Sequence, residues 1–477
     1  MSKGKHTDPL QEGSLVGYPS ELDQEEKLER SLSNRHIQLI AIGGAIGTGL
    51  FMGSGKTLSV SGTSVILTYM IIGFFFFFVM RAMGELLLSN LKYKSFADFC
   101  SAYLGPWAGF FLGWSYWLSW VVAAIADMIV IGGYMQYWDP TLPAWIPAFS
   151  TIIVLTALNL LTVKLFGEME FWFALLKILA ILTFLLVSLY LIFTNFVSPN
   201  GTMASFSHLM DEKAMFPFGL SGFFAGFQIA IFSFIGIELV GTTAAETKDP
   251  HKSLPKAINS IPLRIMLFYV AALICVVSVT SWSQISTEQS PFVQFFTLIG
   301  IPAAASLMNF VVATSAMSSA NSGIFATSRM LYGLSVEKDA APQFGKLTKR
   351  KVPRNSLLFS MLLVVIGTSI LFIVPNVMTA FTIVSTFGSI LVIFTFALIL
   401  MAYLSYRRKA PELHQQSTYK MPMGIFMSWA TLAFLCFSLV ILALNYQTLI
   451  ALAIAPFWFL GLYYFYNKRR KIAQQTL

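Results

Sequence analysis

The sequence predicts an all-α integral membrane protein with about twelve transmembrane helices. Of its 477 residues, 56% are hydrophobic and only 11% are charged, whereas soluble globular chains carry about 25% charged residues. The mean hydropathy of +0.71 points the same way. A surface with so few charges faces lipid, so these numbers exclude a soluble globular protein.

Twelve segments are long and apolar enough to span a bilayer, which takes about 20 residues. A polar tail, residues 1–36, precedes them; we expect it to be disordered and not a cleaved signal. Residues 467–477 are expected to form a second tail. The twelve segments are 37–56, 62–88, 107–134, 145–163, 169–194, 218–243, 260–281, 301–326, 355–374, 378–404, 424–444 and 447–466.

The positions of Lys and Arg predict the orientation, because cytoplasmic loops carry more of them. With the N-terminus inside, only Lys56 and Lys213 fall in external loops. The net charge of +9 therefore reflects topology and not nucleic-acid binding. We expect a multi-pass protein of the cytoplasmic (inner) cell membrane with both tails in the cytoplasm.

Two segments contain sequence that breaks a helix in mid-membrane. The first carries GGAIGTG at residues 43–49, and each interior glycine costs a helix about 1 kcal/mol relative to alanine. Packing against one neighbouring helix does not need four glycines so close together, so we expect an unwound stretch. The sixth segment carries a similar interruption at Ser233 to Glu238.

Irregular backbone at membrane depth lines a cavity or is buried in protein, and interrupted helices at matching positions of two repeats mark a transporter's site. The first and sixth segments match if segments 1–5 and 6–10 form inverted repeats, with segments 11 and 12 appended. Exposed N–H groups favour an anion and exposed carbonyls a cation, which suits a zwitterionic amino acid. The substrate-binding candidates are the N–H groups of Gly47, Thr48 and Gly49 and the carbonyls of Ile42, Ala45, Phe232 and Ile235.

Ionisable residues inside the segments are candidates for proton coupling or gating. Lys177 is the foremost, because a buried ammonium can release its proton; the alternative is that it snorkels to the interface. Glu238 either transfers protons or holds the unwound backbone, and Asp127 is a candidate gate or relay. Arg81 and Glu85, four residues apart on one helix face, are expected to pair.

Other classes of membrane protein fit less well. A channel needs a continuous polar path, and most segments are too apolar. No metal-ligand pattern, GxSxG elbow or paired-aspartate constellation suggests an enzyme, and we expect no metal and no cofactor. Residues 49–57 (GLFMGSGKT) approach a P-loop, but the spacing is one residue off and no soluble βαβ unit surrounds it.

Several motifs resemble those of the amino acid permeases of the amino acid–polyamine–organocation superfamily. The resemblance covers about residues 30 to 470. The motifs are RHIQLIAIGGAIGTGLFMGSGK (35–56), MRAMGELLLSN (80–90), TVKLFGEMEFWFALLKI (162–178), FSFIGIELVGTTAAETKDPHKSLPKAINSIPLRI (232–265), TSAMSSANSG (314–323) and YKMP (419–422).

This resemblance implies a proton symporter with a LeuT-like, five-plus-five inverted-repeat fold. The repeats are then residues 37–194 and 218–404, and residues 405–466 form the two appended helices. It also implies that the carboxylate site falls on Gly47, Thr48 and Gly49. Phe232 is expected to close over the substrate, and Lys177 to take the place that sodium holds in related carriers.

The expected function is secondary active import of small neutral amino acids (D-alanine, D-serine and glycine) by proton symport and alternating access. Its partners are the amino acid, the proton and membrane lipid, without nucleic acid, and the protein is not an enzyme. The alternative is the same mechanism for a neutral L-amino acid (L-alanine, L-serine or proline), or an amino acid exchanger.

Overall fold

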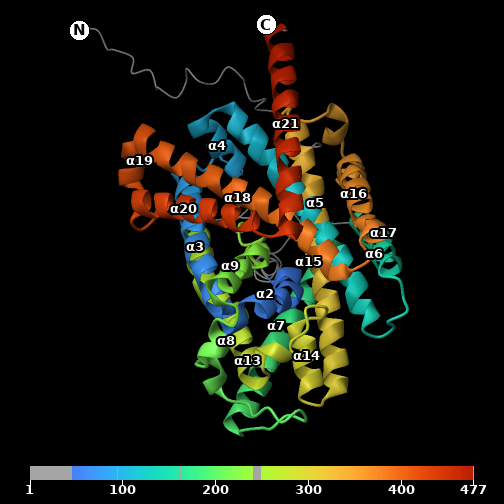
Figure 1. Ribbon diagram of the computed structural model, residues 1–477. Helices are drawn as coiled ribbons and strands as arrows, with labels where there is room; N and C mark the ends of the chain where they lie inside the picture. The colour runs from blue at the N-terminus through green and yellow to red at the C-terminus, as the bar shows by residue number, and fades with distance from the viewer. Residues whose placement is uncertain (1–45, 94, 162, 240–248, 476–477) are drawn as a thin grey trace, which may run out of the picture.

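The computed structural model describes residues 46–93, 95–161, 163–239 and 249–475, and this part of the chain is almost entirely helical (Figure 1). Its only β-type pairing is an isolated bridge between Val197 and Met203. Nine helical runs within these ranges are long and apolar enough to cross a membrane, and Trp145–Asn159 and Gly219–Phe234 are shorter apolar helices. The expected all-α, multi-pass architecture is therefore confirmed.

The helices follow the expected segments closely, with several short additions between them. In chain order they are η2 (Gly49–Gly53), α2 (Ser54–Ser61), η3 (Gly62–Ser64), α3 (Val65–Ser89), α4 (Phe96–Leu104), α5 (Pro106–Gln136), α6 (Trp145–Asn159), α7 (Val163–Phe193), α8 (Glu212–Met215), α9 (Gly219–Ala230), η5 (Ile231–Phe234), α11 (Pro250–Asn259), α12 (Ile261–Ile265), η6 (Met266–Val270), α13 (Ala271–Val279), α14 (Pro291–Leu298), α15 (Pro302–Val336), α16 (Arg354–Thr368), α17 (Ile370–Ile373), α18 (Val377–Lys409), α19 (Pro411–Gln416), α20 (Gly424–Leu442) and α21 (Tyr446–Gln475).

The first segment does not end in a loop at Lys56 as expected. Lys56 lies inside α2, which continues to Ser61 and passes through η3 directly into α3. The Ser61 hydroxyl donates to the Thr57 carbonyl at 2.7 Å, and this bond satisfies a carbonyl in the last turn. Lys213, the other external lysine, lies in the short helix α8.

The core of the molecule is built around α5 and α18, which pack against each other. Helix α5 also packs against α15, and α18 packs against α21. The most apolar 18-residue stretch of α5 is 83% buried and that of α18 is 72% buried, whereas that of α21 is only 22% buried. The outer helices carry large exposed apolar side chains, including Phe193, Ile373 and Phe457. Such a surface suits lipid contact, with α20 and α21 at the periphery.

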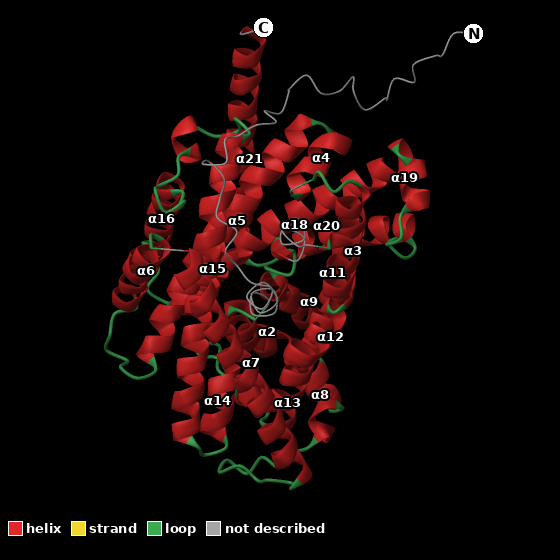
Figure 2. Ribbon diagram, turned by 180° about the vertical axis from the view of Figure 1, so that it is seen from behind, coloured by secondary structure: helices red, strands yellow, loops and turns green. Residues whose placement is uncertain are grey.

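Different helices form the two ends of the molecule. Helices α4 and α19 and the C-terminal end of α21 lie at one end, and α8, α13 and α14 lie at the other (Figures 1 and 2). The first end also carries the basic run Arg407–Lys409, which closes α18. Helix α2, which follows the first interrupted sequence, and helix α9, which precedes the second, lie between these ends (Figure 2).

The expected pairing of Arg81 with Glu85 is wrong. Arg81 donates to Asn259 Oδ1 at 2.8 Å and to the Lys420 carbonyl, and its guanidinium stacks 3.9 Å from the ring centre of Tyr419. The guanidinium therefore binds the Asn259 side chain of α11 and the loop before α20, and not Glu85, its neighbour on α3.

Glu85 instead joins three elements at the α4/α19 end of the molecule. Its buried carboxylate accepts from the Met421 N–H at 2.7 Å and the Tyr403 hydroxyl at 3.1 Å, and it lies 2.5 Å from His414 Nδ1. These partners come from α18, from α19 and from the loop before α20. Glu85 thus fixes the end of α3 to the connection between α18 and α20.

We predict that Glu85→Gln lowers the free energy of unfolding by about 2 kcal/mol, because hydrogen bonds to a charged acceptor contribute about 1.5–3 kcal/mol. Thermal unfolding of the purified protein in detergent measures this loss as a lower Tm. Glu412→Gln, at an exposed position of α19, is the matched control and should leave the Tm unchanged. Equal Tm values for both variants would contradict the assigned role.

Candidate functional site

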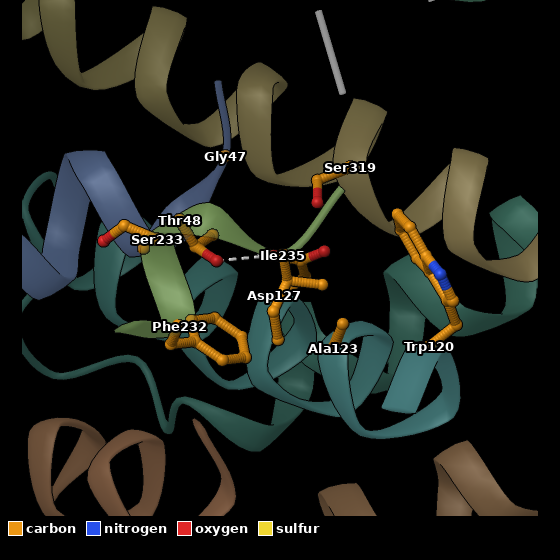
Figure 3. A pocket seen from close by; sticks show the side chains of 10 residues that line it. Gly47, Thr48, Trp120, Ala123, Asp127, Phe232, Ser233, Ile235 and Ser319 are labelled. Carbon is orange, nitrogen blue, oxygen red and sulfur yellow. Dashed lines mark hydrogen bonds between the residues drawn. The ribbon is translucent and has the colours of Figure 1, made fainter. Parts of the chain in front are cut away.

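A pocket lies where the two interrupted segments meet in the middle of the molecule (Figure 3). Together with the solvent space at its mouth, its volume is about 330 Å³. Two stretches of backbone, one in each interrupted segment, together with side chains of α5 and α15 enclose it. Its lining residues are Gly47, Thr48, Gly49, Trp120, Ala123, Asp127, Phe232, Ser233, Ile235 and Ser319.

The first wall is the start of the helix formed by η2 and α2. Thr48 is its N-cap, and the Gly47 carbonyl accepts the Phe51 N–H at 3.2 Å. The first N–H groups of a helix have no partner within it, and the dipole gives this end partial positive charge. The N–H groups at Gly47, Thr48 and Gly49 therefore form a site suited to a carboxylate.

The second wall is the end of the helix formed by α9 and η5. Helical geometry stops at Phe234: Ile235 is extended (φ −62°, ψ 132°) and Gly236 has φ +105°. Side chains with a Cβ rarely adopt that φ, so Gly236 permits the break. The carbonyls that this end exposes carry partial negative charge and suit an ammonium group.

The two breaks touch each other through backbone. A Cβ on Gly49 would lie 2.4 Å from Ser233 Cα and 2.8 Å from Ser233 N. Only glycine allows this approach, because those atoms belong to main chain that cannot rotate away. Glycine is thus required at position 49 because the first and sixth segments contact each other there.

Polar side chains satisfy the backbone groups that the breaks release. The Ile46 carbonyl accepts from Lys177 Nζ and from Ser315 Oγ, each at 3.2 Å. The Ser233 carbonyl accepts the Tyr269 hydroxyl at 2.8 Å. A buried backbone group without a partner is costly, so these side chains hold the unwound geometry in place.

Lys177 is buried, with only 1% of its surface exposed, and its ammonium reaches the break in the first segment. The alternative that it snorkels to the interface is therefore wrong for this conformation. Glu170 and Asp127 also interact with it electrostatically. Opposite charges are needed beside a buried ammonium, because an isolated one would be expelled or neutralised.

Asp127 lies in the pocket wall and points towards Thr48 (Figure 3). Its Oδ1 accepts the Thr48 hydroxyl at 2.7 Å, whereas Oδ2 is buried without a hydrogen-bond partner in the described part of the chain. It shares one face of α5 with Trp120 and Ala123, which lie seven and four residues before it in helical register. A buried acceptor with free capacity can bind a donor that enters the pocket.

Glu238 does not line the pocket. Its Oε2 accepts the Gly236 N–H at 2.9 Å, directly behind the break. This contact fits the interpretation that the carboxylate holds the unwound backbone. Phe232 does line the pocket, and its ring packs edge-on against Phe381 at 5.7 Å between centroids.

Two of the expected residues, Ile42 and Ala45, lie outside the described residues. The structure brings the other five substrate-binding candidates (Gly47, Thr48, Gly49, Phe232 and Ile235) and Asp127 together around one pocket. In the described ranges, no three His, Cys, Asp or Glu side chains gather where they could hold a metal ion.

Sequence reasoning did not single out Trp120, Ala123 or Glu170, and it identified Ser319 only as one member of a polar stripe that bonds helix to helix and in part faces the site. Trp120 and Ala123 share a helix face with Asp127, so helical spacing from that carboxylate could have found them. Ser319 belongs to a polar stripe on α15 that resembles an ordinary helix-packing surface. Glu170 lies seven residues before Lys177 on the same helix, so helical spacing from Lys177 would have indicated Glu170.

Comparison with known proteins gives consistent results along nearly the whole chain. The family model for "Amino acid permease" matches residues 36–476. The D-serine/D-alanine/glycine transporter of Escherichia coli K12 is 58% identical over 449 residues, which are 94% of this chain and 96% of that protein. An amino-acid permease of Bacillus subtilis is 48% identical, covering 93% of this chain and 96% of its own length. A DL-alanine permease of Lactococcus lactis is 42% identical, covering 81% and 84%.

We predict that Gly49→Ala abolishes substrate binding, because its methyl group would push the first and sixth segments apart at the pocket. Equilibrium binding of a radiolabelled amino acid to purified protein measures the effect. Gly333→Ala is the control, since a Cβ there meets nothing within 4 Å. Retained binding in Gly49→Ala, with a normally folded protein, would show that the close approach is not required.

Proposed function

The chain belongs to the amino acid permease family, and from this premise we propose that it imports glycine, D-alanine and D-serine by proton symport. The family membership rests on a model match over residues 36–476 and on relatives aligned over more than nine-tenths of the chain. It confirms the expectation of an amino acid transporter and not an enzyme. The proposal concerns the substrate, its coupling to protons and the orientation of the protein in the membrane.

The observation that carries the substrate assignment is the 58% identity to the D-serine/D-alanine/glycine transporter of Escherichia coli. The size of the pocket supports it. Gly47, Gly49 and Ala123 supply almost no side-chain volume, and the rings of Trp120 and Phe232 occupy much of the remaining wall. Such a space suits a hydrogen, methyl or hydroxymethyl side chain.

The polarity of the pocket supports recognition of the zwitterion. The carboxylate would bind the N–H groups of Gly47, Thr48 and Gly49. The ammonium would bind carbonyls of the break in the sixth segment, at Phe232 and Ile235, together with those of Ile42 and Ala45. Asp127, with its free Oδ2, would add a charge-assisted bond to the ammonium or to the hydroxyl of serine.

The proposed architecture has twelve spans. The nine long helical runs and the two shorter helices support this number, because the turn at Gly62 (φ +59°) divides Gly49–Ser89 between two spans. Segments 1–5 (37–194) and 6–10 (218–404) form the inverted repeats, and 405–466 holds the last two spans. Both tails, 1–36 and 467–477, would lie in the cytoplasm, the side to which the α4/α19 end then belongs, and the protein would reside in the cytoplasmic membrane.

A second candidate function is transport of neutral L-amino acids by the same mechanism. The relative named DL-alanine permease is 42% identical, and no contact of the pocket by itself selects one enantiomer. The two candidates share the fold, the pocket and the coupling, and they differ only in the substrate.

The proposal is tested in vesicles that contain the purified protein, with an inward proton gradient and no sodium. We expect accumulation of radiolabelled D-alanine and glycine, and its loss when a protonophore is added. Accumulation of L-alanine but not D-alanine would favour the second candidate. Uptake that ignores the protonophore would contradict proton symport.

We predict that Lys177→Ala abolishes concentrative uptake but leaves exchange of labelled for unlabelled substrate. Ser315 still satisfies the Ile46 carbonyl, so the pocket keeps its walls, but the proton has no carrier beside the first break. Lys213→Ala, at an exposed position of α8, is the matched control and should accumulate substrate like the unaltered protein. Unchanged accumulation in Lys177→Ala would remove Lys177 from the coupling mechanism.

A further inference from the structure

Glu170 is a fully buried carboxylate that the mechanism above does not use. It lies seven residues before Lys177 on α7, which is two turns and about 10 Å along the axis, on the same helix face. Side chains on a helix lean towards its N-terminus. The long Lys177 side chain therefore leans towards Glu170.

Helix α15 lines the space beside both residues. Ser315, Ser318 and Ser322 follow one another at helical spacing, on the side of α15 that packs against α7. Ser315 shares the Ile46 carbonyl with Lys177, and Ser318 donates to Glu170 Oε1 at 2.5 Å. These hydroxyls form a polar seam, Ser315–Ser318–Ser322, from the Lys177 ammonium to Glu170.

Further buried polar atoms lie along the seam past Ser318. Glu170 Oε2, Asn321 Nδ2 and Ser322 Oγ are buried, and no hydrogen bond of good geometry reaches them within the described ranges. The Asn321 and Ser322 side chains nevertheless lie near enough to the Glu170 carboxyl to interact with it. Donors and acceptors clustered in this way offer a proton a chain of hydrogen-bonding groups.

Charge balance favours proton transfer between these two groups. When Lys177 is an ammonium and Glu170 a carboxylate, each offsets the other's charge in a medium of low polarity. If one proton moves from Nζ to a Glu170 oxygen, both groups become neutral together. Neither state leaves Lys177 or Glu170 as an isolated buried charge, which would be strongly unfavourable. Asp127, the other carboxyl beside Lys177, keeps its hydrogen bond from Thr48 in both states.

We propose that Glu170 accepts the proton that Lys177 releases and passes it to the cytoplasm. An N–H bond of the Lys177 ammonium breaks, an O–H bond forms on Glu170, and the amine and carboxylic acid remain. Glu170 then gives the proton to cytoplasmic water and returns to the carboxylate. This inference rests on the proposed proton symport and on the topology that places the start of α7 on the cytoplasmic side.

The test is Glu170→Gln, which preserves shape but cannot take up and release the proton. In vesicles with a proton gradient, we expect the initial rate of uptake to fall roughly 100-fold, at the low end of what a positioned proton acceptor contributes. Substrate exchange should stay within about twofold, because it needs no net proton release. Uptake by the unaltered protein should also rise with lumenal pH, and this dependence should be lost.

Two further variants separate proton transfer from structure. Glu168→Gln removes an acid on the same helix, about 200° around it from Glu170, and should keep both uptake and its dependence on lumenal pH. Glu170→Asp should restore proton-driven uptake in part, with a shifted dependence on lumenal pH. If Glu170→Gln also loses exchange, the pH dependence of Glu170→Asp decides, and an unshifted profile overturns the inference.

The possible failures can be told apart. If the unaltered protein takes up no proton with its substrate, proton symport itself is wrong and the role of Glu170 falls with it. If the unaltered protein is proton-coupled and Glu170→Gln shows the same uptake and the same dependence on lumenal pH, symport stands and the role of Glu170 is overturned.

Discussion

The close approach of Gly49 to Ser233 is the contact on which the site depends. It brings the N–H end of one half-helix and the carbonyl end of another to the same pocket, with main chain against main chain. Breaking two helices at membrane depth would be prohibitive if the released groups lacked partners. The contact is therefore stable only together with the side chains that satisfy those groups.

The same side chains connect the backbone of the site to proton chemistry. Lys177 binds the Ile46 carbonyl, one residue before the predicted carboxylate site, so its charge state and the geometry of the break depend on each other. Asp127 contacts Thr48 at the pocket, and Glu170 faces the seam on α15. In the proposed mechanism, a change in the protonation of Lys177 would therefore alter the geometry of the substrate site.

Sequence reasoning found the parts of the site that local chemistry determines. The glycine run at 43–49 and the break after Ser233 follow from helix propensity, and Lys177 stood out as a charge in an apolar segment. The pairing of Arg81 with Glu85 failed because partners from distant loops have better geometry than a neighbour on the same helix. The place of Ser319 at the pocket depends on how α15 packs against α5, which spacing along one segment does not determine. Helical spacing from Asp127 and Lys177 could have indicated Trp120 and Glu170.

The most direct test of proton-coupled transport is the steady-state accumulation ratio of D-alanine or glycine in vesicles as the pH gradient varies, with the membrane potential held at zero. One proton per zwitterion predicts that the ratio rises about tenfold for each pH unit, since one unit corresponds to about 1.4 kcal/mol. A ratio that stays near one at every gradient would contradict the account and would indicate an exchanger or a passive carrier.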